Sequence, residues 1–197
     1  MDVLETIKTR RSTRRFAEKP LKQEDLEKII EAGRYAPSGG NSQSTRFFVI
    51  TDRKVLDALA ETVQDAFAEM EITEGMYRSM VSSIMQSKKG NYRFHYDCPA
   101  LIVLANKMDY GNNIADCACA LENMMIAANS LDLGSCWVNQ LKWLNENEKI
   151  LSLFTSFGLQ EDERIYGALA LGHAQSEDGL PERKPLERKG NPVHRIA

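Results

Sequence analysis

The chain has 197 residues, the length of a typical domain, and we expect one unit over residues 1–197. Its apolar fraction of 43% and charged fraction of 27% are ordinary for a globular protein, while a net charge of −3 argues against nucleic acid as the main partner. No apolar run approaches the roughly 20 residues of a membrane span, and residues 1–5 lack the order of a signal peptide, so we expect a cytoplasmic protein.

The sequence offers little sign of a metal site or of disulfides. The four cysteines form no C-x-x-C pair, and three of them stand among apolar residues, where a free thiol behaves as a small hydrophobe. The three histidines, His95, His173 and His194, are far apart along the chain. We therefore expect no bound metal.

Two helices are predicted at the start of the chain. Asp2 and Glu5 form a capping box, which predicts a first helix whose apolar face is Val3, Leu4 and Ile7. A second helix is expected after Pro20, and it ends before the loop-forming run 36–41. Its buried face is marked at helical spacing by Leu26, Ile29, Ile30 and Gly33.

A strand and two helices are predicted next. Residues 47–50 predict a buried strand, and Asp52 then caps a helix. The apolar face of that helix is formed by Val55, Leu56, Leu59, Val63 and Phe67. Residues 74–87 predict a polar helix, either a plain surface helix or, within residues 72–95, a segment that covers a substrate.

The most apolar elements lie in the second half of the chain. The continuous apolar run 100–105 predicts a central strand covered on both faces. Residues 114–131 are apolar on nearly every side, which indicates a buried helix, and residues 135–138 predict a short extended segment. A second capping box, formed by Asn145 and Glu148, predicts a further helix, and residues 165–171 predict the last strand.

This order of elements favours an α+β fold or a three-layer α/β/α fold. It is not a regular βαβ alternation, and no G-x-G-x-x-G motif is present, so a Rossmann fold is not expected. Residues 173–197 are polar and contain three prolines, so they form a tail that cannot build a core of its own.

Four segments carry residues suited to chemistry. Residues 10–15 hold four arginines and two hydroxyls, which either complement a helix C-terminus or grip a phosphate. The loop 36–43 presents amides and hydroxyls, and it is either a turn or the edge of a site for a polar heterocycle. Residues 133–140 lead out of the buried helix, with Trp137 as core filler or as a neighbour of a ligand. The run 181–185 is most simply a solvated charge cluster.

Taken together, these segments resemble the nitroreductase family of FMN enzymes. The matching elements are R-R-S-x-R at 10–14, A-P-S-G-x-N-x-Q at 36–43, G-S-C-W at 134–137 and R-K-P at 183–185. Each motif alone is only moderately specific. Four motifs in the family's order span nearly the whole chain, which makes the resemblance strong.

The resemblance implies a fold, a cofactor and an assembly. The fold would be a three-layer α/β/α, nitroreductase-like α+β fold with a mixed, mainly antiparallel sheet and a buried central helix. Two chains would form an intertwined homodimer with FMN at the subunit interface. The tail, residues 173–197, would wrap the partner subunit. The other partner would be a small-molecule electron acceptor, with no role for nucleic acid or a membrane.

It also implies which residues contact the flavin. Arg10 and Ser12 match phosphate and ribityl contacts, with Arg11 beside them, and Arg14 matches a basic position near the pyrimidine ring. The tail cations Arg183 and Lys184 would reach the same phosphate. The loop of the other subunit would supply Pro37, Ser38, Gly39, Asn41 and Gln43. The stretch whose backbone N–H points at flavin N5 would be Val138, Asn139 and Gln140.

Two further positions are matched by the resemblance to the family. Asn91 matches an asparagine that hydrogen-bonds the pyrimidine edge. Some relatives carry a lysine three positions later, where this chain has Phe94. The flavin would then have one cation fewer nearby, and Phe94 would shape the substrate pocket instead.

The implied activity is transfer of hydride from NADH or NADPH, through the flavin, to nitroaromatics, quinones or similar electron-poor molecules. One open flavin face serving both in turn predicts ping-pong kinetics. No catalytic side chain is expected, because the flavin carries the chemistry while the protein binds and tunes it.

Alternatives remain at this stage. The same scaffold serves reductive dehalogenation, enone reduction and flavin fragmentation. Another class is a flavin-binding carrier or sensor without turnover, and a third is a scaffold that binds a different nucleotide through residues 10–15.

Overall fold

The computed structural model describes residues 2–196 and is organised around one sheet of four strands. The strands are β1 (Arg46–Ile50), β2 (Ala100–Lys107), β3 (Gly134–Val138) and β4 (Glu163–Gly172). They lie in the order β1-β2-β4-β3, and every neighbouring pair is antiparallel. The predicted mixed α+β fold with a mainly antiparallel sheet is therefore confirmed.

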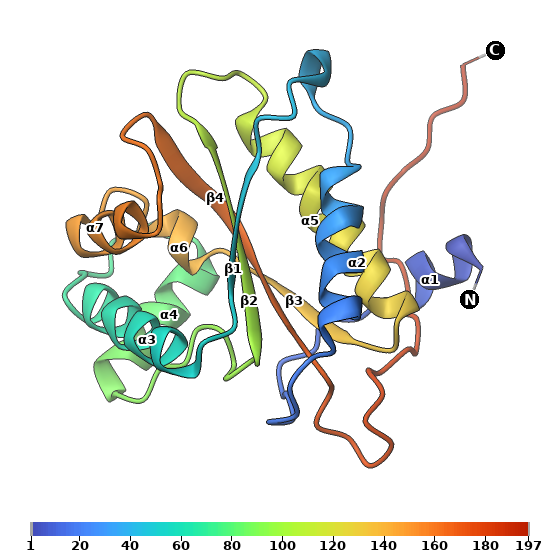
Figure 1. Ribbon diagram of the computed structural model, residues 1–197, viewed down its shortest axis with the longest axis horizontal. Helices are drawn as coiled ribbons and strands as arrows, with labels where there is room; N and C mark the ends of the chain where they lie inside the picture. The colour runs from blue at the N-terminus through green and yellow to red at the C-terminus, as the bar shows by residue number, and fades with distance from the viewer. Residues whose placement is uncertain (1, 197) are drawn as a thin grey trace.

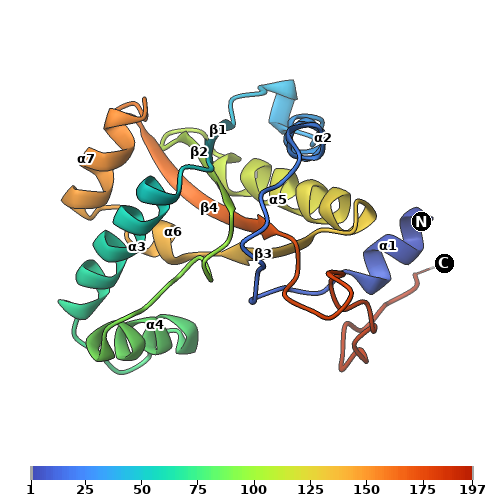
Figure 2. The same ribbon diagram turned by 60° about the horizontal axis from the view of Figure 1, so that its bottom comes forward.

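Helices cover both faces of this sheet, which gives the three layers seen in Figures 1 and 2. One face carries α2 (Gln23–Arg34) and α5 (Asn113–Ser130), with α1 (Val3–Thr9) packed against α5. The other face carries α3 (Arg53–Ala68), α4 (Arg78–Lys89), α6 (Gln140–Trp143) and α7 (Glu148–Ser156).

Strand β2 explains why the sheet needs cover on both sides. Its residues 100–105 are all fully buried, and they alternate between the two hydrophobic cores. Ile102 and Leu104 face α2 and α5, whereas Leu101 and Val103 face α3 and α7. Side chains on a strand point to opposite faces in turn, so a continuous apolar run requires a layer on each side.

The helix starts follow the predicted caps at two of three places. The Asp2 carboxylate accepts from the Glu5 N–H at 3.4 Å, and Asp52 accepts from the Val55 N–H at 3.1 Å. The predicted cap at Asn145 is wrong, because Asn147 caps α7 by accepting from the N–H groups of Lys149 and Ile150. Asn145 instead accepts from the Ile165 N–H at 2.8 Å and ties this turn to β4.

Three other sequence expectations need correction. Strand β1 is an edge strand, so Val49 is 39% exposed rather than buried. Helix α4 begins at Arg78, four residues later than predicted. Helix α1 packs on α5 through the buried Thr6 and Thr9, which leaves the apolar Val3, Leu4 and Ile7 exposed.

The tail leaves β4 and runs along the same side of the molecule as α1 (Figures 1 and 2). Residues 175–196 contain no helix or strand and are mostly exposed. Within the part of the chain that the structure describes, no helix is both long and apolar enough to cross a membrane.

Candidate functional site

The arginine segment, residues 10–15, lies along strand β3. The Thr13 N–H donates to the Ser135 carbonyl at 2.9 Å, and Ser12 forms a parallel bridge with Ser135. Gly134 permits this approach, because a Cβ there would lie only 2.6 Å from Thr13 Oγ1. The structure thus brings together two of the motifs, R-R-S-x-R and G-S-C-W.

Polar groups of this segment gather around one thiol. Burial raises the pKa of Cys136, and the nearby Arg14, Ser12 and Arg10 oppose that rise. Ser12 and Arg14 are exposed, as residues two apart on one side of an extended segment can be. Arg10 has a long ion pair, 3.9 Å to Glu122. Guanidinium and hydroxyl groups placed together in this way suit an anion such as phosphate.

The tail meets the arginine segment within the same chain. Arg11 Nη1 donates to the Lys184 carbonyl at 2.7 Å and lies 3.7 Å from the Glu182 carboxylate. Arg183 donates to the Asn129 carbonyl at 2.6 Å and pairs with Asp132 at 2.6 Å, so its guanidinium holds the C-terminal end of α5. Contact of Arg183 or Lys184 with a phosphate stays a prediction.

The segment Val138–Gln140 follows β3 and turns into α6. The Trp137 indole N–H donates to the Asn139 amide oxygen at 2.9 Å, and the Gln140 amide nitrogen donates to the Tyr92 hydroxyl at 2.8 Å. These side-chain groups are committed to the protein. A ligand on this segment would therefore be met mainly by its backbone, as the sequence resemblance implies.

Asn91 lies near the segment Val138–Gln140 because the next residue, Tyr92, is hydrogen-bonded to Gln140. It follows the end of α4 with a left-handed backbone (φ 59°) and immediately precedes Tyr92, the partner of Gln140. Its side chain is exposed.

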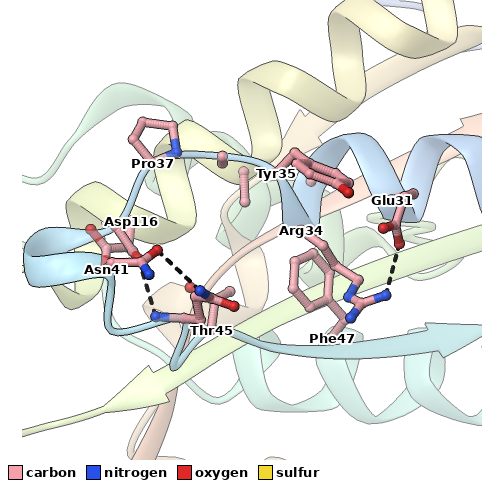
Figure 3. A pocket seen from close by; sticks show the side chains of 13 residues that line it. Glu31, Arg34, Tyr35, Pro37, Asn41, Thr45, Phe47 and Asp116 are labelled. Carbon is pink, nitrogen blue, oxygen red and sulfur yellow. Dashed lines mark hydrogen bonds and ion pairs between the residues drawn. The ribbon is translucent and has the colours of Figure 1, made fainter.

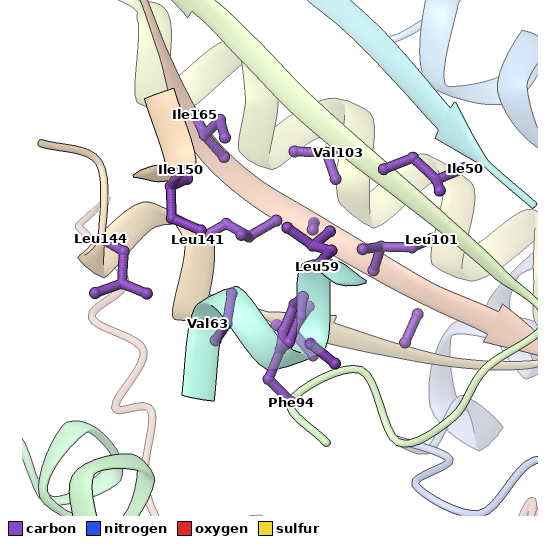
Figure 4. Close-up of a cluster of buried hydrophobic side chains, with 14 of the residues drawn as sticks. Ile50, Leu59, Val63, Phe94, Leu101, Val103, Leu141, Leu144, Ile150 and Ile165 are labelled. Carbon is purple, nitrogen blue, oxygen red and sulfur yellow. The ribbon is translucent and has the colours of Figure 1, made fainter. Parts of the chain in front are cut away.

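Phe94 does not face a substrate pocket, and that prediction is wrong. Its side chain is fully buried in the core between the sheet and α3, beside Leu59 and Leu101 (Figure 4). An apolar ring at this position is drawn into the core rather than left beside an open site.

The loop 36–43 forms a separate locus. It lines a cavity of about 470 Å³, together with residues of α2 and α5 (Figure 3). The predicted residues in this lining are Pro37, Ser38, Asn41 and Gln43. Asn41 and Gln43 both have left-handed backbone (φ 55° and 49°), a conformation that the surrounding contacts must hold in place.

The start of α5 anchors this loop. The Gly39 N–H donates to Asp116 at 3.2 Å, and the Tyr110 hydroxyl contacts both Asp116 and the Gly39 carbonyl, at 2.8 and 3.0 Å. A side chain at Gly39 would collide with the side chains of Asn112 and Tyr110. Sequence reasoning missed Asp116, although a carboxylate near the start of a mostly apolar helix indicates a buried partner.

The two loci lie at opposite ends of α5. Asp116 near its start holds the loop, whereas Asn129 near its end contacts Thr6 and Arg183, close to the arginine segment. Thirteen residues of helix separate these anchors, a distance of about 20 Å. One chain therefore does not bring all the predicted site residues together. Within the described residues, no group of three or more potential ligands could hold a metal ion.

Comparison with known proteins shows which family has this combination of motifs. The model of the Nitroreductase family matches residues 7–173. The chain belongs to the nitroreductase family. The matched residues include both the loop 36–43 and the arginine segment with its neighbouring strand β3.

Solved structures and curated proteins agree with this membership. The nitroreductase chain is similar to a nitroreductase with bound FMN from Bacteroides fragilis, at 33% identity and a TM-score of 0.84, with 99% of this chain and 100% of that chain covered. A second FMN-bound nitroreductase, from Desulfitobacterium hafniense, is 25% identical with a TM-score of 0.78 and coverage of 98% and 100%. A nitrobenzene nitroreductase from Ectopseudomonas oleovorans is 25% identical over 90% of this chain and 88% of its own length.

Proposed function

We propose that this protein is an FMN-dependent oxidoreductase that takes hydride from NADH or NADPH and reduces nitroaromatics, quinones or similar electron-poor acceptors by a ping-pong mechanism. Family membership and the FMN-bound relatives support the flavin chemistry. One observation supports this assignment for the chain itself: the arginine segment lies along β3, with Arg10, Ser12 and Arg14 near Cys136.

The residues present fit the phosphate of FMN. Arg10, Ser12 and Arg14 offer charged and neutral donors around Cys136, and no carboxylate contacts Arg10 closer than the 3.9 Å of Glu122 among the described residues. Charge-assisted hydrogen bonds from arginine are the strong ones for phosphate. Arg11 holds the tail against this segment, which places Lys184 near the same surface.

The separation of the loop 36–43 from the arginine segment, at opposite ends of α5, supports a homodimer. A two-fold partner with its α5 antiparallel would bring its loop 36–43 to the arginine segment of this chain. Helix α5 leaves Ile114, Ala115 and Cys119 exposed, and α1 exposes Val3 and Leu4, so apolar surface is ready to be covered. Each shared site would then combine residues 10–14 and 138–140 of one subunit with the loop of the other.

When bound, FMN supplies the hydride chemistry between the two substrates. The chain's own residues orient and tune it. Arg14 would place positive charge where the reduced cofactor is negative, a preorganised electrostatic contribution. The segment Val138–Gln140 would present backbone N–H groups to the ring, since the Gln140 side chain is buried against Tyr92 and the Asn139 amide oxygen accepts from Trp137.

Anaerobic reduction tests this proposal. Purified protein loaded with FMN is mixed with NADH or with NADPH under argon, and a nitroarene is then added. We expect the flavin absorbance to bleach and then to return, and initial rates with both substrates varied to give parallel double-reciprocal lines. A spectrum that stays oxidised with both donors would favour a flavin carrier or sensor. Intersecting lines would exclude the ping-pong mechanism.

A further inference from the structure

A buried chain of hydrogen bonds links α4 to the segment that follows β3. The Gln140 amide nitrogen donates to the Tyr92 hydroxyl at 2.8 Å, Tyr92 and Ser83 share a hydrogen bond of 2.8 Å, and the Ser83 hydroxyl reaches the Ser79 carbonyl at 3.1 Å. A carbonyl only accepts, so Ser83 donates to it. Tyr92 must then donate to Ser83 and accept from Gln140, which gives the whole chain one direction.

Tyr92 is itself held firmly by its surroundings. Its backbone N–H donates to the Gln64 side chain on α3 at 2.6 Å, and its ring meets Phe67 edge-on at 6.4 Å. The side chain is 9% exposed, and burial raises the pKa of the hydroxyl, which keeps it protonated and able to donate. Tyr92 is thus a fixed point to which Gln140 is attached.

This polar cluster does not optimise the stability of the core. Ser83, Ser87 and Gln140 are all more than nine-tenths buried, yet Ser87 Oγ and Gln140 Oε1 have no hydrogen-bond partner among the described residues. Apolar side chains of similar size would avoid these unsatisfied groups. A buried polar group that is only partly satisfied calls for another explanation, and a role at a functional site is one.

We infer that Tyr92 is a positioning residue for the flavin site. Through Gln140 it fixes the backbone of Val138–Gln140, and through its own place in the chain it fixes the left-handed turn at Asn91. The two segments expected to meet the flavin ring are therefore joined through one residue, and its hydroxyl sets the position of Val138–Gln140. This inference rests on the proposed function, because it assigns the ring to the surface formed by these segments.

The variant Tyr92→Phe removes only the hydroxyl and keeps the ring. We expect it to weaken binding of oxidised FMN about fivefold, the factor associated with one neutral hydrogen bond. With binding of the reduced form unchanged, the ratio of oxidised to reduced affinity changes by the same factor of about five, which corresponds to a rise in midpoint potential of about 20 mV for a two-electron couple. The potential rises because a displaced backbone donor stabilises the oxidised ring less well.

A second tyrosine provides a matched control. The Tyr166 hydroxyl accepts from Asn113 at 2.8 Å on the opposite face of the sheet, so Tyr166→Phe loses a comparable bond away from this segment. Gln140→Met should reproduce the shift in potential, and the double variant with Tyr92→Phe should add nothing further, as expected for two residues acting through one bond.

The measurements are FMN titrations of the apoprotein, midpoint potentials against a reference dye, and thermal melting of each variant. Tyr92→Phe with the affinity and the potential of the unmodified protein overturns the inference. An unchanged potential with a lowered melting temperature also overturns it, because the hydroxyl would then be merely structural. Failure of the unmodified protein to bind FMN would instead overturn the proposed function, so the two failures are distinguishable.

Discussion

At the scale of single residues, His95 shows how burial fixes a charge state. The side chain is fully buried, and its Nε2 lies 3.1 Å from the Leu56 carbonyl, which can only accept. The proton of the neutral ring is therefore on Nε2, and Nδ1 has no partner among the described residues. Burial first, and then the charges of Arg93 and Arg53, lower the pKa of His95 to about 4.

This lowered pKa predicts loss of stability in acid. Between pH 6.5 and about 4 the unfolded chain binds a proton at His95 that the folded chain does not, so stability falls as the pH falls through this window. The difference amounts to about 3 kcal/mol. Urea unfolding at both ends of the window should show that His95→Gln loses less stability than the unmodified protein. His194→Gln, in the exposed tail, is the control, and equal losses in all three proteins would contradict the assignment.

Arg10 should contribute directly to cofactor retention. Its guanidinium is only partly exposed and lies 3.9 Å from Glu122, a distance at which that ion pair satisfies it poorly. Removing a charge-assisted bond to phosphate should weaken FMN binding by about 1.5–3 kcal/mol. Fluorescence titration of Arg10→Ala would measure this. Lys8→Ala, an exposed cation in α1, should leave the affinity unchanged, and the same affinity in Arg10→Ala would remove Arg10 from the phosphate site.

At the scale of elements, the start of α7 provides a test of helix capping. Asn147 accepts from two N–H groups of the first turn, at 3.1 and 3.2 Å. Asn147→Ala should lower the free energy of unfolding by about 1 kcal/mol, and Asn147→Asp should retain most of it, because aspartate also caps well. Chemical denaturation of both variants checks this. Equal stability of the alanine variant and the unmodified protein would contradict the cap.

The elements that sequence reasoning placed well are those with a strong periodic or apolar pattern. The sequence predicts the buried run of β2 and the mostly apolar helix α5 correctly, because burial on two faces leaves few positions for polar residues. The cap predicted at Asn145 is wrong because two asparagines stand two residues apart, and spacing alone does not show which one faces the helix.

The sequence predicts only those parts of the candidate site whose functional residues are close together along the chain. The arginine segment and the loop 36–43 stand out by composition, and the structure gives each a defined place. The link between Tyr92 and Gln140 joins residues 48 positions apart, so no local pattern marks it. Phe94 failed for a related reason, since only the packing of α3 on the sheet shows that its ring is enclosed.

At the scale of the whole molecule, the surface of α5 indicates self-association. Ile114 is 50% exposed, Ala115 and Cys119 are exposed, and Ala118 and Ile126 are half-buried, so the outer face of the helix is mostly apolar and is interrupted by Glu122, which pairs with Arg10. Helix α1 adds Leu4, which is 62% exposed. A helix that is apolar on its outer face as well as its inner one is expected to be covered.

Ala115→Arg tests whether this face is the dimer interface. A large cation on a small apolar position would be buried without a partner, so we expect dissociation into monomers. Because each proposed site combines the loop 36–43 of one subunit with the arginine segment of the other, bound FMN should be lost as well. Sedimentation velocity and the ratio of flavin to protein absorbance measure both effects on one sample.

The control is Ala58→Arg, which places the same charge on an exposed position of α3, on the other face of the sheet, and should leave both measurements unchanged. An Ala115→Arg protein that stays dimeric and fully loaded would show that this face of α5 lies outside the interface. A monomer that keeps its FMN would be the more serious result, because the two loci at either end of α5 would then not need each other.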